Sequence, residues 1–259
     1  MFFSLRRVGG EAFNAVSQSM VSRFISKHTK IIVENLAPIY VRFPRTVAEM
    51  NVTNGNSDKN SIFPARSVKG LHSLNVQIVC DSEMKITNVN ARYPGSFHDA
   101  FVYGNSQIYV FMENQIQLRL NEWNWLIGDS AYNLSPWLMK VFPHGPNLTN
   151  EERNFNRRIC SVRSLIEHVI GLLKMRFRCL LGERQLHYNQ TKVGQIVYAC
   201  ATLHNFLISK QFDIMHGIDF NQFNAGVINK VNDINNLNNA NHQLNGIDRR
   251  NELIRFFNQ

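Results

Sequence analysis

Three acidic residues occupy positions in the sequence from which side chains commonly reach a ligand. Asp99 follows a Pro-Gly-Ser turn, Asp129 ends a short apolar segment, and Glu167 interrupts the apolar run RSLIEHVIGLLK. Carboxylates that converge at one end of a sheet suit a hard cation such as Mg²⁺, which takes oxygen ligands and keeps several waters. Two such ions about 4 Å apart can activate a water and stabilise the leaving oxygen in phosphodiester cleavage. The three acids therefore indicate metal-dependent chemistry on a phosphate ester.

Each acid also has an ordinary structural explanation. Asp99 could cap a helix, and Asp129 could be a turn residue, although an aspartate at a strand end is enriched at α/β active sites. Glu167 could pair with Arg163 at i, i+4 on a solvated face, which is worth only about 0.3 kcal/mol. None of the three positions is decisive when it is taken alone.

The surroundings of Glu167 are basic. Residues 151 to 184 contain eight basic side chains against four acidic ones. Arg163, Glu167 and Lys174 fall on one helical face, and Arg176 follows close behind. A carboxylate among cations suits a metal site that also holds a phosphate backbone. A solvated charged helix is the plainer alternative.

A second basic stretch lies near the amino terminus. From Glu11 to Ala37 the apolar residues recur at helical spacing, broken at residues 17 to 19, where Ser17 or Ser19 could cap the longer helix. Its exposed face would carry Arg23 and Lys27. The pair has the outline of a helix-turn-helix that contacts DNA; the alternative is a basic amphipathic helix packed on the main domain.

The elements that position the acids can be predicted from periodicity. Residues 75 to 81 and 85 to 93 predict an antiparallel hairpin, and a helix begins near residue 98. Residues 125 to 129 predict a buried strand. Two helices follow, from about 152 to 177 and from about 191 to 209; the first has a core stripe at near-ideal spacing, Ile159, Val162, Ile166, Val169 and Leu173. The pattern predicts an α/β domain.

Composition narrows the class of protein. The chain has 259 residues, 44% of them hydrophobic, and a net charge of +9, so one globular domain with a polyanionic partner is expected. No apolar run approaches the roughly 18 residues of a membrane span. The amino terminus has the wrong order of charge and apolar residues for a secretory signal, so we expect an intracellular protein. Residues 221 to 259 contain twelve asparagines, which predicts a low-complexity tail.

Five segments together resemble the DDE endonuclease domain of Harbinger transposases and of the nuclease derived from them. They occur in that family's order and spacing and cover about 140 residues from Lys69 to Ser209. The segments are KGLHSLNVQIVCD, YPGSFHDAFVYG, WLIGDSAYNLSPWLM, NRRICSVRSLIEHVIGLLKMRFRCL and VYACATLHNFL. The resemblance reaches upstream, where AVSQSMVSRFISKHTKII is similar to the family's helix-turn-helix and VRFP to the linker after it.

The resemblance implies a fold, a chemistry and partners. It implies an RNase H-like mixed sheet flanked by helices, in which Asp99, Asp129 and Glu167 hold Mg²⁺ or Mn²⁺ and catalyse hydrolysis of DNA. Arg163, Lys174, Arg176, Arg23 and Lys27 are expected to contact the nucleic acid. A Myb-like accessory protein and residence in the nucleus, with the cytoplasm as a further location, are also implied.

The sequence departs from the family where the first catalytic aspartate is expected. The family has an apolar strand ending in Asp-Gly-Thr-His between its VRFP-like and KGLHS-like stretches, whereas this interval holds RTVAEMNVTNGNSDKNSIFPARSV, with no such strand apparent. We therefore divide the chain into a helix-turn-helix-like remnant (1–45), a polar loop (46–68), a nuclease-like domain (69–212) whose sheet is incomplete at its first strand, and an asparagine-rich tail (213–259). An impaired nuclease and an inactive DNA-binding or protein-interaction module both remain open.

Overall fold

The fold combines helices with one mixed sheet in a computed structural model that describes residues 17–44, 61–66, 73–117, 125–181, 186–210 and 245–258. For residues 61–66 the backbone alone is described. The elements are α1 (Gln18–Ile31), the π-helix η1 (Ile32–Leu36), α2 (Ala37–Tyr40), β1 (Ser61–Arg66), β2 (Leu74–Cys80), β3 (Ile86–Pro94), α4 (Asp99–Gly104), α5 (Gln107–Gln117), β4 (Leu126–Ile127), β5 (Leu138–Met139), α6 (Asn150–Arg176), the 3₁₀ helix η2 (Arg178–Leu180), α7 (Gln190–Ser209) and α9 (Gly246–Phe257).

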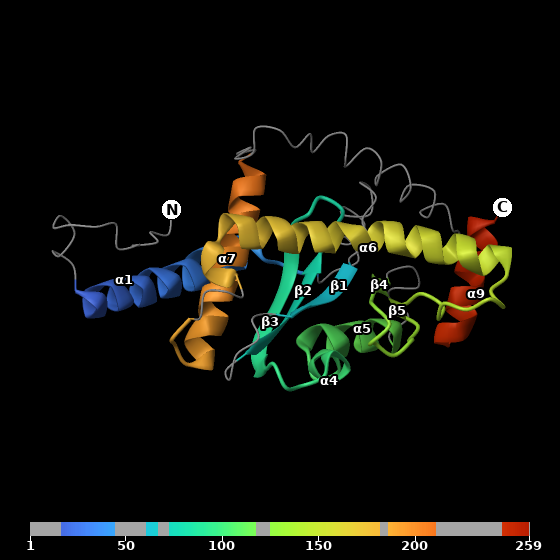
Figure 1. Ribbon diagram of the computed structural model, residues 1–259, viewed down its shortest axis with the longest axis horizontal. Coiled ribbons are helices and arrows are strands. Elements are labelled where there is room, and N and C mark those ends of the chain that lie inside the picture. Colours follow the sequence, from blue (N-terminus) through green and yellow to red (C-terminus); the bar gives the residue numbers. More distant parts are fainter. Residues whose placement is uncertain are drawn as a thin grey trace.

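The sheet has five strands in the order β3-β2-β1-β4-β5 (Figure 1). β1, β2 and β3 are antiparallel neighbours, and β4 and β5 continue the sheet parallel to β1. The predicted hairpin is confirmed as β2 and β3. Its turn includes Met84, the only described residue other than glycine with a positive φ, at 61°.

The position of β1 corrects the expectation of a polar loop over residues 46–68. The backbone of residues 61–66 pairs with β2 along its length and with β4 at Ser61↔Ile127, so the centre of the sheet is filled. The segment SIFPAR is short and contains a proline, and its own sequence predicts a strand weakly. Backbone pairing with the strands on both sides holds this segment in a strand conformation that its own residues do not favour. Residues 46–60 and 67–68 of the predicted loop lie outside the described part.

α6 covers one face of the sheet, above it in Figure 1. A capping box starts the helix: Glu152 N–H donates to Thr149 Oγ1 at 3.1 Å, and Thr149 N–H donates to the Glu152 carboxylate at 2.8 Å. Every residue of the predicted core stripe is buried. These side chains pack with one alternating face of β2, formed by Leu74, Val76, Ile78 and Cys80.

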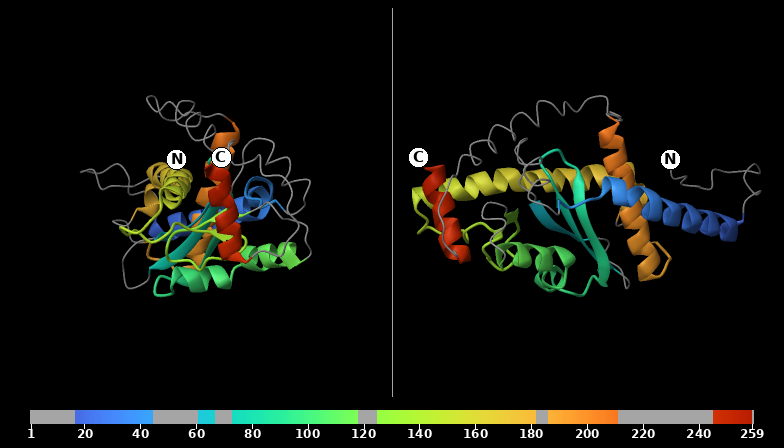
Figure 2. Two further views of the ribbon diagram at one scale, coloured as in Figure 1. Left: turned by 90° about the vertical axis from the view of Figure 1, so that its right-hand side faces the viewer. Right: turned by 180° about the vertical axis from the view of Figure 1, so that it is seen from behind.

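α4 and α5 lie on the opposite face of the sheet, as the edge-on and rear views of Figure 2 also show. A second apolar cluster forms there around Val79 and Tyr132, with Tyr103 from α4 and Met112 from α5. The sheet is therefore covered on both sides. No helix among the described residues is long and apolar enough to cross a membrane.

The amino-terminal helices pack on α7. Ser17 caps α1 by accepting a hydrogen bond from Met20 N–H at 3.2 Å, as predicted. Lys192 of α7 donates to Ser22 Oγ at 3.1 Å. The first helix of the predicted helix-turn-helix lies outside the described residues, so this motif stays a prediction. Arg23 and Lys27 are exposed on α1.

The expectation of a low-complexity asparagine-rich tail is wrong for its last residues, because they fold into α9. Asn245 caps this helix by accepting from Ile247 N–H and Asp248 N–H, both at 2.9 Å. The buried residues Leu253, Ile254 and Phe257 join the core that α6 forms. Composition concealed the helix because its apolar face occupies only a few positions among polar ones. Residues 211–244 lie outside the described part.

Candidate active site

Asp99 is the first residue of α4 and is tied to the sheet. Asn75 of β2, which is 4% exposed, donates its amide Nδ2 to Asp99 Oδ1 at 2.7 Å and to the Phe97 carbonyl at 3.1 Å. His98 holds the N-cap position of α4, without a side-chain capping bond. Asp99 is therefore held by a strand residue, and the view that it serves only as a helix cap does not account for this contact.

Asp129 follows β4 after one glycine. Its Oδ1 accepts a hydrogen bond from Ala131 N–H at 2.8 Å, so the predicted turn role is present as well. The turn folds Tyr132 back onto the strand. A Cβ atom at Gly128 would lie 2.9 Å from the Tyr132 ring, so this close approach requires glycine.

Tyr132 brings the two aspartates into one site. Its side chain is 1% exposed and packs edge-on against Tyr103, with 5.5 Å between ring centroids. Burial raises the pKa of the Tyr132 phenol, and the negative charges of Asp99 and then Asp129 raise it further. Both carboxylates therefore lie within electrostatic range of the same hydroxyl.

The same site contains buried polar atoms without hydrogen-bond partners. Among the described residues, these are Asn75 Oδ1, both amide atoms of Gln77, and the Tyr132 hydroxyl oxygen. The Gln77 amide lies near enough to the phenol to lower its pKa slightly, but not in hydrogen-bond geometry. Unpaired buried polar groups cost free energy, so a cluster of them beside two carboxylates is typical of a site that receives a ligand.

Glu167 is not part of this group. Its side chain is 65% exposed on α6, and Oε1 lies 3.6 Å from Arg163 Nη2 at i, i+4. No group of three or more His, Cys, Asp or Glu side chains able to hold a metal occurs in the described part of the chain. The structure thus brings Asp99 and Asp129 together around Tyr132 and leaves the role of Glu167 a prediction from the family resemblance.

The strand between β2 and β4 supplies no further acid. β1 lies between β2 and β4, where the missing catalytic strand was expected, yet none of its six residues, SIFPAR, is acidic. Two carboxylates and nearby amide oxygens are donors that suit one Mg²⁺ or Mn²⁺ ion with waters in its remaining positions. They do not fit a two-metal site, which needs additional acidic ligands.

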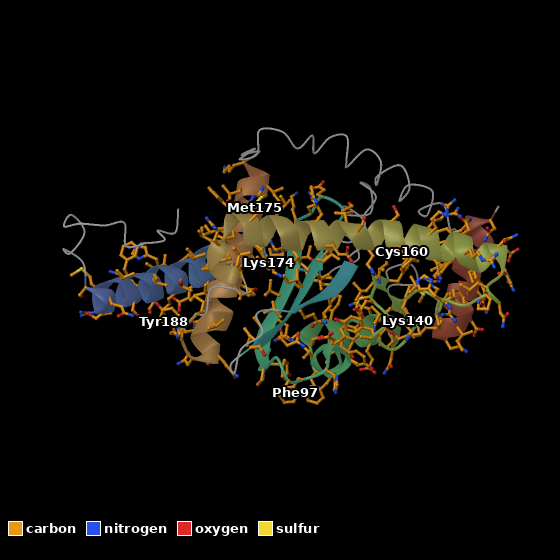
Figure 3. All side chains as sticks on the ribbon, in the orientation of Figure 1. Phe97, Lys140, Cys160, Lys174, Met175 and Tyr188 are labelled. Carbon is orange, nitrogen blue, oxygen red and sulfur yellow. The ribbon has the colours of Figure 1, made fainter. Side chains whose placement is uncertain are left out.

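The predicted basic residues divide into two kinds. Arg163 and Lys174 are half-buried on α6, and Figure 3 shows Lys174 toward the end of α6 that meets α7. Arg176 instead turns inward, and its Nη1 donates to His204 Nδ1 at 3.0 Å. Its contribution to DNA binding, like that of Arg163, Lys174, Arg23 and Lys27, stays a prediction.

Lys140 is a cation near the site that the sequence analysis missed. It follows β5, and its Nζ donates to the Tyr132 carbonyl at 2.7 Å (Figure 3). Asn75 and Gln77 were also missed. Their signal was present in the sequence, because both interrupt the otherwise apolar strand LNVQIVC at alternate positions that face the same side.

Comparisons with known proteins identify the family of the chain. The family described as "DDE superfamily endonuclease" matches residues 52–205. The protein named "Putative nuclease HARBI1" is 30% identical in Homo sapiens over 222 residues and 29% identical in Xenopus laevis over 228 residues; each match covers 77% of this chain and 62% of the relative. "Protein ALP1-like" of Arabidopsis thaliana is 28% identical over 148 residues, covering 54% of this chain and 36% of that protein.

The chain spans about three fifths of the length of the first two of these relatives. No solved structure matches it. The family match covers more than half of the chain and includes Asp99, Asp129, Tyr132 and Glu167. On this evidence, the chain belongs to the DDE superfamily endonuclease family.

Proposed function

We propose that the chain is a divalent-metal-dependent DNA endonuclease domain of the Harbinger transposase type, with impaired activity. Asp99, Asp129 and Glu167 are the proposed ligands of Mg²⁺ or Mn²⁺, whose role when bound would be to activate water and neutralise phosphate charge. The observation that carries the proposal is the convergence of Asp99 and Asp129 on Tyr132, amid amide oxygens without partners.

The architecture supports the same proposal. A mixed five-stranded sheet with helices on both faces agrees with the RNase H-like fold that the resemblance implies. Asp129 lies two residues beyond the end of β4, an interior strand, and open α/β sheets place ligands at such strand ends. The basic net charge of the chain favours DNA as substrate. We further propose residence in the nucleus and assistance by a Myb-like protein, in line with the family.

A second candidate function follows from a specific observation. β1 has no carboxylate, and Glu167 is exposed and paired with Arg163. A chain with two of the expected ligands loses most two-metal catalysis. It would then act as a catalytically inactive DNA-binding or protein-interaction module that retains the shape of the nuclease.

Nicking of supercoiled plasmid by the purified chain, with Mg²⁺ or Mn²⁺, separates the two functions. We expect Asp129→Asn to lower the nicking rate by about 100-fold or more, because the metal loses a charged ligand. Glu167→Gln should lower it strongly as well if Glu167 is a ligand. Glu34→Gln is the matched control, since Glu34 is 58% exposed and pairs with Lys30 at i, i+4 as Glu167 does with Arg163.

Each outcome of the nicking assay has one meaning. A rate that falls with Asp129→Asn and Glu167→Gln, but not with Glu34→Gln, supports the endonuclease. A wild-type chain that binds the plasmid but nicks it no faster than Asp129→Asn contradicts the endonuclease and supports the inactive module.

A further inference from the structure

A cavity of about 980 Å³ lies between the amino-terminal helices, the β3 edge of the sheet and α7. Its walls include Arg42 after α2, Arg92 of β3, Gln107 at the start of α5, and Gln190, Gln195 and Tyr198 of α7. Asp99, Asp129 and Tyr132 are not among the residues that line it. The cavity is therefore a separate space from the aspartate site.

The charged residues in the cavity lining are all basic. Its lining holds two arginines and no acidic residue. Two helices of more than ten residues also begin in its wall, α5 at Gln107 and α7 at Gln190, and neither has an acidic residue in its first turn. Helix amino termini carry partial positive charge, so the two helix starts and the two arginines favour an anion.

Arg92 is available to such an anion. Its side chain is exposed, and it has no hydrogen bond or ion pair with any described residue. It lines the cavity together with Tyr198: burial raises the pKa of the Tyr198 phenol, and the positive charge of Arg92 opposes that rise. Nearby, Gly194 seats α7 closely on β3, because a Cβ there would lie 2.4 Å from the Ala91 carbonyl oxygen. The wall that carries Arg92 and Tyr198 is thus firmly packed.

We propose that this cavity binds the phosphate backbone of a DNA strand, away from the bond that the aspartate site would cleave. The choice of DNA rests on the proposed function. The size supports a strand over a single inorganic ion, since a cavity near 1,000 Å³ accommodates a ligand of several hundred daltons. Three glutamine side chains in the lining can donate to and accept from sugar and base edges. The positive cavity would hold the substrate while the acidic site holds the metal.

Fluorescence anisotropy of a labelled DNA duplex tests this proposal. Binding is measured at several salt concentrations in the presence of EDTA, so that cleavage does not enter the result. The logarithm of the binding constant falls linearly with the logarithm of the salt concentration, and loss of one phosphate contact should make this negative slope shallower by about 0.9. The wild type should then lose about threefold more affinity than Arg92→Ala as salt rises from about 50 to about 200 mM.

Two further variants sharpen the measurement. Arg255→Ala is the matched control, because Arg255 is an exposed arginine on α9, which lies at the opposite end of the molecule from α1 and α7 in Figure 1, and it should keep the wild-type slope. Gln190→Glu places a negative charge at the start of α7 and should weaken DNA binding in the same direction as Arg92→Ala. Thermal unfolding of each variant verifies that it is folded.

The outcomes separate this proposal from the proposed function. Arg92→Ala and Gln190→Glu that bind DNA as the wild type does would overturn the proposal, whatever the plasmid nicking assay gives. Stabilisation by inorganic pyrophosphate or binding of poly-glutamate that depends on Arg92, without Arg92-dependent DNA binding, would also overturn it, in favour of a free phosphate or an acidic peptide. A reduced slope in both variants supports it even if nicking is absent.

Discussion

Two clusters of buried polar side chains lie against the β2–β3 hairpin, and they differ in how completely they are hydrogen-bonded. The first, which we term the His204–Asn205 cluster, joins these two residues of α7 to the turn and start of β3. The second, the Gln77–Tyr132 cluster, consists of the buried residues Asn75, Gln77 and Tyr132, beside the half-buried Asp99 and Asp129. Both clusters are shielded from water by apolar cores, so hydrogen bonds decide their free energy.

In the His204–Asn205 cluster, every nitrogen and oxygen atom of the two side chains takes part in a hydrogen bond. Asn205 Oδ1 accepts from Ile86 N–H at 2.8 Å, and its Nδ2 donates to the carbonyls of Ile86 and Tyr40, both at 2.6 Å. His204 Nε2 donates to the Met84 carbonyl at 3.1 Å, while its Nδ1 accepts from Arg176. The pattern requires a neutral imidazole with its proton on Nε2.

In the Gln77–Tyr132 cluster several polar atoms have no partner among the described residues, as set out above. The comparison teaches that burial of polar groups alone does not identify a functional site. A fully bonded cluster fixes α7 and the amino-terminal helices to the sheet, whereas an incompletely bonded one, beside carboxylates, costs stability and keeps capacity for a ligand.

Asn205→Ala should produce the largest effect on stability. The substitution leaves Ile86 N–H and the carbonyls of Ile86 and Tyr40 without this partner in a buried region, and each such group costs about 1 to 3 kcal/mol. We expect the free energy of unfolding to fall by about 4 kcal/mol in urea titrations. Asn35→Ala is the control, because the Asn35 amide is exposed and makes one bond within its own helical segment, to Ile31. Equal effects of the two variants would remove the distinction between the clusters.

His204 should make stability depend on pH. Burial, reinforced by the positive charge of Arg176, lowers the pKa of His204 to about 4, against about 6.5 when unfolded. Between these values the unfolded state binds more protons, so stability falls as the pH falls from about 6.5 to about 4, by about 3 kcal/mol.

The measurement is the midpoint of urea unfolding across that pH range. His204→Gln should flatten the profile, whereas His144→Gln, at an exposed position, should leave it unchanged. A profile that stays the same in His204→Gln would mean that another group carries the pH dependence.

Gln77→Met should have the smallest effect on stability, of the opposite sign. Methionine has a similar volume and removes two amide atoms that lack partners, so stability should stay the same or rise by up to about 1 kcal/mol. Plasmid nicking, where present, should decrease, because the side chain lies beside Tyr132. A loss of about 2 kcal/mol or more on urea titration would show that Gln77 is bonded in solution and would make the two clusters alike.

The elements around both clusters were predictable where the signal is local. Hairpin residues 75–93, the buried stripe of α6 and the Ser17 cap follow from alternation, helical spacing and capping chemistry. β1 and α9 were not predictable, since SIFPAR gains its strand conformation from β2 and β4, and the asparagine content of the carboxyl-terminal segment masks three buried apolar residues.

The three candidate acids and the family to which they point follow from residue types and their spacing along the chain. The folded chain was needed to find that Asp99 and Asp129 both act electrostatically on Tyr132, that Glu167 is exposed beside Arg163, and that a strand without a carboxylate completes the sheet. The physical reason is that these relations depend on strand pairing and helix rotation between segments far apart in the chain, which no local pattern fixes.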